Sequence, residues 1–328
     1  MNLFATVLTY PAPSANYRGE SEENRTIIQK VTHGRWEYPI ISPEAMRNAL
    51  REILATYGLP CNRERLGNEE QLAVRFADYP WPEHYADDFF FGYFVADRRQ
   101  IPADVVRDRA FQFKRDSILR MNLALGLEPY RHDAIFTQSP LTVPNEQARW
   151  QNATTSALLH RETAVTAFQY PFALNLNDCR LDDPERGEEY KRWLRCLLKA
   201  IAELNGVAGN HARSYFEMAP ASIVIRLSDS LVAGYNTYGF QPDGSFPEVT
   251  KGIEQGDYAA SEFHIGGLIV RDGLCNTEAL KGKEGKGVGI YRMANAALDA
   301  VAKKVSGEGF LPKADSKKKE ASDAPAAS

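Results

Sequence analysis

The sequence predicts a mixed α+β fold in which helices pack against a β-sheet. Strand-like and helix-like segments alternate along the chain, interrupted by insertions, which is the pattern of such a sandwich. Of the 328 residues, 44% are hydrophobic, which is enough for one large domain or two modest ones. With 16 Phe, 15 Tyr and 4 Trp residues, the chain as a whole is not disordered.

The first predicted elements are a strand and a long loop. Residues 3–10 are rich in β-forming side chains and are followed by Pro11 and Pro13, which predicts a short strand. Residues 14–39 are polar and aperiodic, so we expect a long loop, of the kind that is usually functional or disordered.

A helix after residue 42 has the strongest local signals. Ser42 is a good N-cap, and Pro43 suits the first helical position, where its missing N–H costs nothing. Gly58 supplies a stop. Between them the apolar residues recur at helical spacing and form one buried stripe: Met46, Ala49, Leu50, Ile53, Leu54 and Tyr57.

The pattern of the remaining residues predicts an insertion, a hairpin and further strands and helices. Residues 60–134 are expected to be largely helical, with a helix within residues 107–127 and a local core of aromatic side chains, Phe89, Phe90, Phe91, Tyr93 and Phe94. Two β-leaning stretches around a polar tip predict a protruding hairpin, whose second arm continues into the sheet. The later expected elements are helices at 188–205 and 291–304, strands at 222–227 and 263–270, and a disordered tail at 312–328.

Charge is segregated along the chain, although the net charge is only −4. Residues 25–51 hold five Lys and Arg against two Glu, whereas residues 63–97 hold three Arg against eight Asp and Glu. This pattern suits a positive groove with a negative flank, or a subunit whose acidic patch meets the basic patch of the next copy. No apolar run approaches the roughly 20 residues that a membrane span needs, and the four cysteines are widely spaced. We therefore expect a cytoplasmic protein with reduced thiols and no membrane contact.

Signatures of catalysis are nearly missing from the sequence. The motifs H-E-x-x-H, G-x-S-x-G and G-x-x-x-x-G-K-[ST] do not occur, and the six histidines are scattered. We expect no catalytic residue, no metal and no cofactor. His160, beside Arg161 and Glu162, is the most reactive-looking cluster, but a histidine among charges is usually a solvated loop group. A triad assembled from distant residues would leave no such motif.

The strongest functional signal is a pair of arginines on the predicted helix. Arg47 and Arg51 are four residues apart, on the face opposite the apolar stripe, and like charges at this spacing repel each other. An anion would relieve that repulsion, and a helix N-terminus adds N–H groups and a positive dipole end. Ser42, Arg47 and Arg51 therefore describe a phosphate site. The alternative is a solvated helix face with Arg51 paired to a distant carboxylate, and the spacing alone does not decide between them.

The segment before this helix favours the phosphate interpretation. It supplies amide and cationic donors: Asn16, Arg18, Asn24, Arg25, Lys30, His33 and Arg35. Arginine forks suit phosphate groups better than a lysine point charge does. A row of phosphates contacted without base readout is a site that follows a nucleic-acid backbone.

Three segments resemble the DevR-type backbone subunits of type I CRISPR surveillance complexes, with the I-B branch favoured. The most specific is NRTIIQKVTHGRWEYPIISPEAMRNALRE, at 24–52, where the family has a strand, a polar loop and an "iS-x-x-a-x-R-x-a-L-R" helix. HRETAVTAFQYPFALNL, at 160–176, resembles the strand that returns from the family's thumb hairpin. GNHARSYFEMAPASIVIR, at 209–226, resembles a later block. The likeness spans most of residues 1–270, except for 60–130.

The resemblance implies a modified RRM-like (ferredoxin-like) palm, a helical finger insertion and a β-hairpin thumb. On this chain the palm would be residues 1–59 and 166–311, the finger 60–134 and the thumb 135–165. It further implies a non-enzymatic subunit that polymerises along CRISPR RNA and presents it for pairing with a target DNA strand. Its partners would be the RNA, the target strand, neighbouring copies of itself and the other Cascade subunits.

The resemblance also implies roles for individual residues. RNA phosphates would be held by Ser42, Arg47, Asn48 and Arg51 on the helix, with Asn16, Arg18, Asn24, Arg25, Lys30 and Arg35 before it. An apolar side chain near the thumb tip, from Leu141, Val143 or Trp150, would wedge between bases, although such residues are more often ordinary hairpin packing. Lys281, Lys283 and Lys286 would add a second contact, unless they form a solvated lysine loop.

Two other functions fit parts of the sequence. A type III relative would cleave bound target RNA with a loop aspartate, but residues 14–41 contain four Glu and no Asp. A metabolic α+β enzyme would use Arg47, Arg51 and the helix N-terminus to hold a phosphorylated small molecule. Dependence of binding on RNA length separates a filament from such an enzyme.

Overall fold

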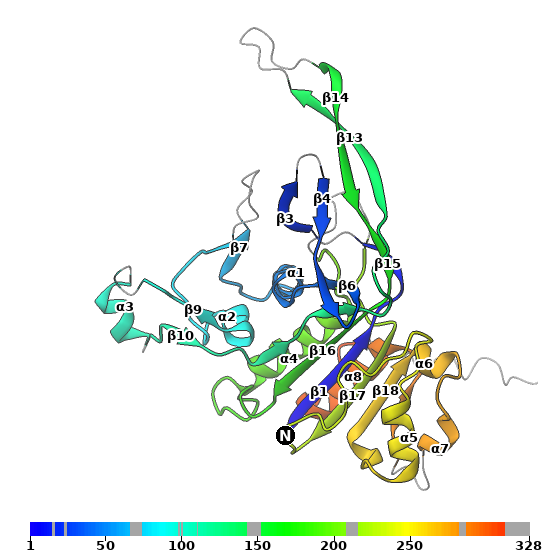
Figure 1. Ribbon diagram of the computed structural model, residues 1–328. Coiled ribbons are helices and arrows are strands. Elements are labelled where there is room, and N and C mark those ends of the chain that lie inside the picture. The colour runs from blue at the N-terminus through cyan, green and yellow to red at the C-terminus, as the bar shows by residue number, and fades with distance from the viewer. Residues whose placement is uncertain are drawn as a thin grey trace, which may run out of the picture.

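The computed structural model describes residues 1–14, 17–22, 25–65, 74–97, 99, 101–109, 111–142, 152–207, 216–281 and 287–311 (Figure 1). Several predicted positions lie outside these residues: Asn16, Asn24, Val143, Trp150, Lys283, Lys286, the block 208–215 and the tail 312–328. No helix in the described part of the chain combines the length and the apolar character needed to cross a membrane.

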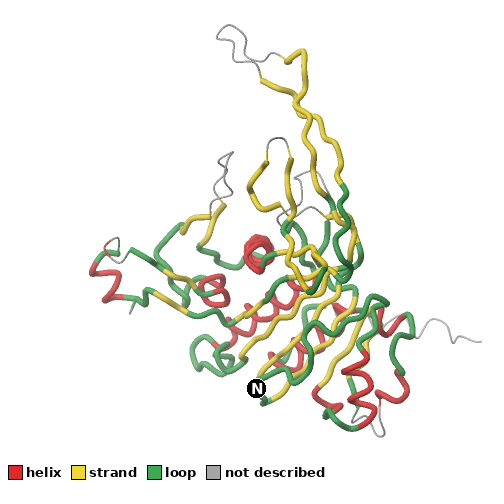
Figure 2. The backbone as a smooth tube through the Cα atoms, in the orientation of Figure 1, coloured by secondary structure: helices red, strands yellow, loops and turns green. Residues whose placement is uncertain are grey.

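A large sheet forms the centre of the molecule (Figures 1 and 2). Within the described ranges nine strands join it, and β11 (Leu119–Met121) pairs with β16 beside the main path. Neighbouring strands are antiparallel except for the last two, which are parallel. From one edge to the other, the order is β5 (Lys30–His33), β6 (Trp36–Ile41), β12 (Ala124–Gly126), β16 (Phe168–Asn175), β1 (Asn2–Leu8), β17 (Ser222–Ser228), β18 (Phe263–Gly267) and β19 (Gly289–Tyr291).

Both faces of this sheet are covered. Successive side chains of a strand point to opposite faces, so Ile223 and Ile225 of β17 join one apolar cluster while Val224 joins the other. The larger cluster contains the apolar faces of α1 (Pro43–Thr56), α4 (Gly187–Ala202) and α8 (Ala294–Ser306). The smaller one contains side chains of α5 (Pro247–Gln255), α6 (Leu268–Arg271) and α7 (Thr277–Lys281). The mixed α+β expectation is confirmed.

The predicted helix after Ser42 is confirmed with its cap. The Ser42 hydroxyl accepts a hydrogen bond from the backbone N–H of Ala45 at 3.2 Å, and Pro43 occupies the first turn. Gly58, at φ +76°, follows the end of the helix in the left-handed region that favours glycine. The predicted stripe is buried at Met46, Ala49, Leu50 and Leu54.

The loop expected at 14–39 is wrong, because strands occupy most of it. β3 (Tyr17–Glu22) pairs with β4 (Arg25–Ile28), and β5 pairs with β6 in the main sheet. Their side chains are largely polar, so the segment has little apolar periodicity. The backbone hydrogen bonds come from pairing between neighbouring strands and from pairing with strands further along the chain. β4 also runs parallel to β14 (Asn152–Glu162), which pairs with β13 (Ala134–Thr142) in the long hairpin that projects from the sheet (Figure 1).

The helical character expected for residues 60–134 is also wrong in part. The described residues there form two short helices, α2 (Ala86–Phe91) and α3 (Ala103–Asp108), among short strands. No helix follows α3 within 107–127, because β11 and β12 cover the edge of β16 and bury Leu119 and Ala124. The remaining strands are β7 (Arg63–Arg65), β8 (Val74–Phe76), β9 (Tyr93–Phe94) and β10 (Lys114–Arg115).

The aromatic run of α2 packs into the main core rather than into a core of its own. Phe89 stacks on Tyr190 of α4 with ring centroids 4.8 Å apart, and Phe90 is fully buried. Phe94 departs from the expectation, since 68% of its surface is exposed. The insertion is therefore attached to α1 and α4 through α2.

The later elements agree with the prediction except at one strand end. α4, β17 and α8 lie where helices and a strand are expected, but β18 ends at Gly267 rather than at residue 270. Gly267 has φ +101°, and a Cβ there would lie 2.0 Å from the carbonyl oxygen of Ala221. Only glycine fits this turn, after which the chain continues as α6.

Candidate functional site

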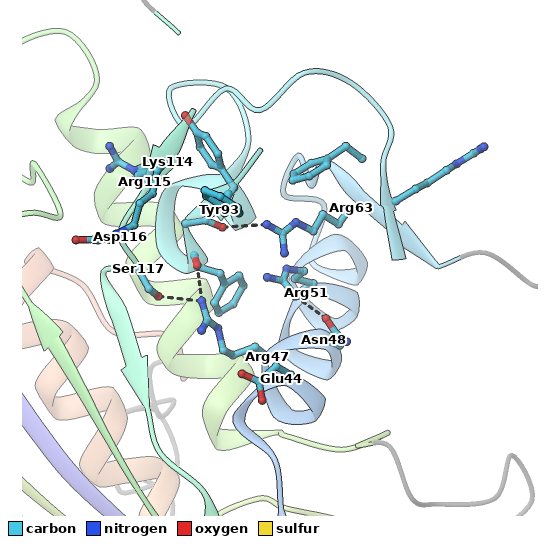
Figure 3. Close-up of a pocket in the computed structure, with 15 residues that line it drawn as sticks. Glu44, Arg47, Asn48, Arg51, Arg63, Tyr93, Lys114, Arg115, Asp116 and Ser117 are labelled. Atoms are coloured by element: carbon cyan, nitrogen blue, oxygen red, sulfur yellow. Dashed lines mark hydrogen bonds and ion pairs between the residues drawn. The ribbon is translucent and has the colours of Figure 1, made fainter. Parts of the chain in front are cut away.

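A positively charged hollow lies between α1 and the insertion that follows it (Figure 3). Its volume is about 570 Å³, and we call it the α1 hollow. Six cations line it against two carboxylates, Glu44 and Asp116. The cations are Arg47, Arg51, Arg63, Arg75, Lys114 and Arg115. Such an excess of guanidinium and ammonium groups in a concave site is suited to a polyanion.

Arg47 is half-buried at the floor of the hollow, and the insertion fixes its position. One terminal nitrogen donates hydrogen bonds to the carbonyl oxygen of Phe91 and, at 3.1 Å, to the hydroxyl of Ser117. The guanidinium carbon lies 5.6 Å from the centroid of the Phe91 ring. Burial lowers the pKa of Arg47, and the charge of Glu44 opposes this shift. The guanidinium remains a cation at neutral pH because its ordinary pKa lies above about 12.

Arg51 is buried, with 7% of its surface exposed. It donates a hydrogen bond to the side-chain oxygen of Asn48 at 2.5 Å, and its Nε lies 3.9 Å from Oδ2 of Asp87. The guanidinium carbon lies 4.8 Å from the Phe91 ring centroid. Burial lowers the pKa of Arg51 to about 10, with a further contribution from the charge of Arg63. Arg51 therefore stays charged in a poorly solvated place.

The expectation that both arginines stand on a free helix face is corrected by these contacts. Residues 63, 75–76, 91–94 and 114–117 lie opposite this face of α1, so Arg47 and Arg51 line a site between two parts of the chain. Arg51 also has the distant carboxylate that the alternative interpretation required, in Asp87. Both interpretations therefore hold in part, because Arg51 is paired with Asp87 and also lines the cationic hollow.

Four further cations of the hollow were missed by the sequence reasoning. Arg63 donates to the carbonyl oxygen of Gly92 at 3.0 Å and lies over the Phe76 ring, while Arg75 pairs with Glu64 at 2.8 Å. Lys114 pairs with Asp116 at 3.3 Å, and Arg115 lies over the Phe89 ring. Arg63 and Arg75 lie in a segment that is acidic in sum, so its net charge gives no sign of a cationic site.

Part of the acidic surplus of that segment is not on the surface, because two of its eight carboxylates lie inside the protein. Asp87 and Asp88 are both buried. Asp87 accepts hydrogen bonds from the backbone N–H groups of Asn62 and Arg63, at 2.7 and 3.1 Å. Asp88 accepts from the side chain of Asn62 at 2.8 Å and from the backbone of Trp81 at 3.0 Å. These two carboxylates hold the start of β7, and with it Arg63, against α2.

The buried Asp88 carboxyl makes folding stability depend on pH. Burial raises the pKa of the Asp88 carboxyl to about 6, and the charge of Asp87 adds to the shift. An unfolded Asp titrates near about 3.9, so Asp88 contributes stability that is present below about pH 4 and lost as the pH rises through about 6. Between those limits we expect the free energy of unfolding to fall by about 2 kcal/mol more in the parent than in an Asp88→Asn variant. Chemical denaturation at several pH values in this range measures the free energy of unfolding of the parent and of the variant. If the two free energies changed equally with pH, the raised pKa of Asp88 would be contradicted.

The other predicted residues with described side chains lie away from the α1 hollow. The Ser42 hydroxyl caps α1, as described above. Lys30 lies 3.3 Å from Glu37 and 3.8 Å from Glu162, and its ammonium lies over the Tyr130 ring. Arg35 is exposed in the turn between β5 and β6, over the Trp36 ring. Among the predicted residues whose side chains the structure describes, those that line the hollow are Arg47, Asn48 and Arg51.

The remaining predicted positions are on other elements. Arg18, Arg25 and Leu141 are in β3, β4 and β13, where the description covers the backbone but not these side chains. Lys281 ends α7 and pairs with Glu278 at 2.9 Å. Among the residues that the structure covers, no group of three or more His, Cys, Asp and Glu side chains is placed to hold a metal ion.

Comparison with solved structures assigns the fold. No protein-family model matches the chain. A chain of a CRISPR RNA-guided surveillance complex in a pre-nicking state superposes with a TM-score of 0.59 at 10% identity, covering 93% of this chain and 100% of that one. A second CRISPR RNA-guided surveillance complex gives a TM-score of 0.54 at 13% identity, covering 93% and 99%. The mixed α+β architecture is thus shared with chains of such complexes.

A curated relative agrees with the structural match. The CRISPR-associated protein Cas7/Cst2/DevR of Myxococcus xanthus (strain DK1622) is 28% identical over an alignment of 297 residues, which covers 87% of this chain and 92% of that protein. The resemblance of this chain to the Cas7/Cst2/DevR family is therefore confirmed.

Proposed function

We propose that this chain is a CRISPR RNA-binding backbone subunit of a type I surveillance complex. Copies of it would polymerise along the guide RNA and present it for pairing with a target DNA strand, together with the other Cascade subunits and without catalysing a reaction. The names of the relative and of the structural neighbours support this assignment, since all three belong to CRISPR systems.

One observation carries the proposal, namely the composition and the construction of the α1 hollow. Its arginines lie against the aromatic faces of Phe91 and Phe76, which restrain the guanidinium planes before any ligand arrives. Restrained guanidinium groups lose less entropy on binding phosphate than flexible cations do. Contacts of this type hold a backbone and read no base, which suits a protein that must accept any guide sequence.

The domains follow the same proposal. Residues 1–59 and 166–311 would form the RRM-like palm, 60–134 the finger and 135–165 the thumb. The hairpin of β13 and β14 extends well beyond the main sheet (Figure 1), and Ile135 and Phe136 near its base are 49% and 66% exposed. Exposed apolar side chains on a projecting hairpin are suited to contact with bases or with a second copy.

The roles of individual residues are modified by their contacts. Arg47, Asn48 and Arg51 would act at RNA phosphates together with Arg63 and Arg75. Ser42 would act through the cap of α1, because its hydroxyl already accepts a hydrogen bond. Arg18, Arg25, Lys30 and Arg35 would meet the RNA along β3 to β6, and Lys30 would first have to leave Glu37 and Glu162.

Binding to single-stranded RNA of increasing length tests the proposal. We expect the number of bound copies to rise with RNA length and the binding curve to become steeper, because each bound copy adds a neighbour contact to its phosphate contacts. Sedimentation of the complexes gives the stoichiometry. Saturation at one copy per RNA at every length would contradict a backbone subunit and favour the phosphorylated small-molecule alternative.

A further inference from the structure

A second hollow lies on the other side of the segment that borders the α1 hollow. Its volume is about 560 Å³. The two hollows share residues 114–117, so a single stretch of chain, containing β10, is their common wall. Arg120 of β11 and Arg180, in the turn before α4, line only the second one, which we call the Arg120 hollow.

The Arg120 hollow is also cationic. Lys114, Arg115, Arg120 and Arg180 line it against the carboxylates of Asp116 and Asp178. Asp178 accepts a hydrogen bond from Asn175 at 2.8 Å. Arg180 lies 3.4 Å from Glu83, while the exposed Arg120 guanidinium has no ion pair among the described residues.

Two further details concern the cations of this hollow. The buried Nε of Arg115, on the common wall, has no hydrogen-bond partner within the described part of the chain. Arg180 has φ +51°, a backbone conformation in which an L-residue is strained and glycine is not.

We propose that the two hollows form one track that holds at least two phosphodiesters of the same single strand, with Arg115 between them. The inference rests on the proposed RNA-binding function and deepens it, by adding Arg115, Arg120 and Arg180 as contacts. A nucleic-acid strand suits the track better than an acidic peptide does, because Phe94 on the rim of the α1 hollow is 68% exposed. An exposed aromatic ring beside phosphate-sized cationic hollows offers a surface for a base to stack on.

Salt dependence of RNA affinity tests the track. Each contact to a single-strand phosphate contributes about 0.7 to the slope of log affinity against log salt concentration. We expect an Arg120→Gln/Arg180→Gln variant to have a slope shallower by about 1.4 than the parent. Between about 50 and about 200 mM salt the variant would then lose about sevenfold less affinity than the parent does. The single variant Arg120→Gln, which breaks no ion pair within the described residues, should have a slope shallower by about 0.7.

A matched control replaces two exposed lysines that line neither hollow, Lys251 and Lys303, by glutamine. Thermal unfolding of all variants establishes that they fold like the parent. If the parent binds RNA and the Arg120/Arg180 variant keeps its slope, the track is wrong and the proposed function stands. If the variant loses self-association at an unchanged slope, the Arg120 hollow is a contact between copies and the track is wrong. Failure of the parent itself to bind RNA would overturn both proposals.

Discussion

Reversing the charge of Arg75 and Lys114 together is expected to weaken binding of single-stranded RNA by about 100-fold at low salt. Both side chains line the α1 hollow and are largely solvated, at 60% and 69% exposure, so they are available to a ligand. Each lost hydrogen bond to a charged phosphate costs about 1.5 kcal/mol, and two give about 3 kcal/mol, or about 100-fold. Fluorescence anisotropy with a labelled RNA measures the change.

The two substitutions are expected to leave folding almost unchanged, so a change in RNA binding can be assigned to the lost charges. Substitutions at exposed positions usually change the free energy of unfolding by no more than about 0.5 kcal/mol. The matched control is Arg107→Glu with Lys251→Glu, which removes the same charge at exposed residues outside the hollow. A folded Arg75→Glu/Lys114→Glu variant that binds RNA no worse than this control would exclude the α1 hollow as the phosphate site.

Replacing Arg51 by alanine is expected to lower the free energy of unfolding by about 3 kcal/mol. Its guanidinium is the cation next to the buried Asp87 carboxylate, and removing one partner of a buried pair leaves an uncompensated charge. The substitution also removes the hydrogen bond to Asn48 and the contact with the Phe91 ring. Urea denaturation at neutral pH gives the difference from the parent.

Two other variants serve as comparisons for the stability of Arg51→Ala. Arg51→Lys keeps the charge but not the planar fork, so it should lose about half as much stability. Arg75→Ala, at the exposed rim, should change stability by no more than about 0.5 kcal/mol. If Arg51→Ala is as stable as Arg75→Ala, the contacts of Arg51 with Asp87, Asn48 and Phe91 do not stabilise the fold. Because Arg51 is structural as well as cationic, reversing Arg47 and Arg51 together would confound folding with binding.

The elements that could be predicted from the sequence are those with local signals. The helix α1 carries its cap, its proline and its apolar stripe within 16 residues, Ser42 to Tyr57, so nothing distant is needed to recognise it. The strands β11 and β12 carry no comparable signal. They form because β16 offers an edge that they cover, and β16 begins more than 40 residues further along the chain. The strands before α1 are not predicted either, because their side chains are largely polar and show no alternation, although β3–β4 and β5–β6 are local pairs.

The candidate site likewise contains residues with a local sequence signal and residues that only the fold brings together. Arg47 and Arg51 could be found because their spacing on one helix is itself a signal. Arg63, Arg75, Lys114 and Arg115 belong to the same hollow only through the fold, which packs β7, β8 and β10 beside α1. The pairing of Arg51 with Asp87 spans 36 residues and depends on α2. The sequence therefore predicts that an anion site exists on α1, and the fold determines its size and its walls.

Purification of the protein from cells, with absorbance read at 260 and 280 nm before and after a high-salt wash, tests the central claim most directly. The proposed function predicts a high-mass species rich in nucleic acid, which releases RNA of uniform length when salt weakens the phosphate contacts. A monomer of about 37 kDa that carries no nucleic acid and does not bind long single-stranded RNA even at low salt would contradict it.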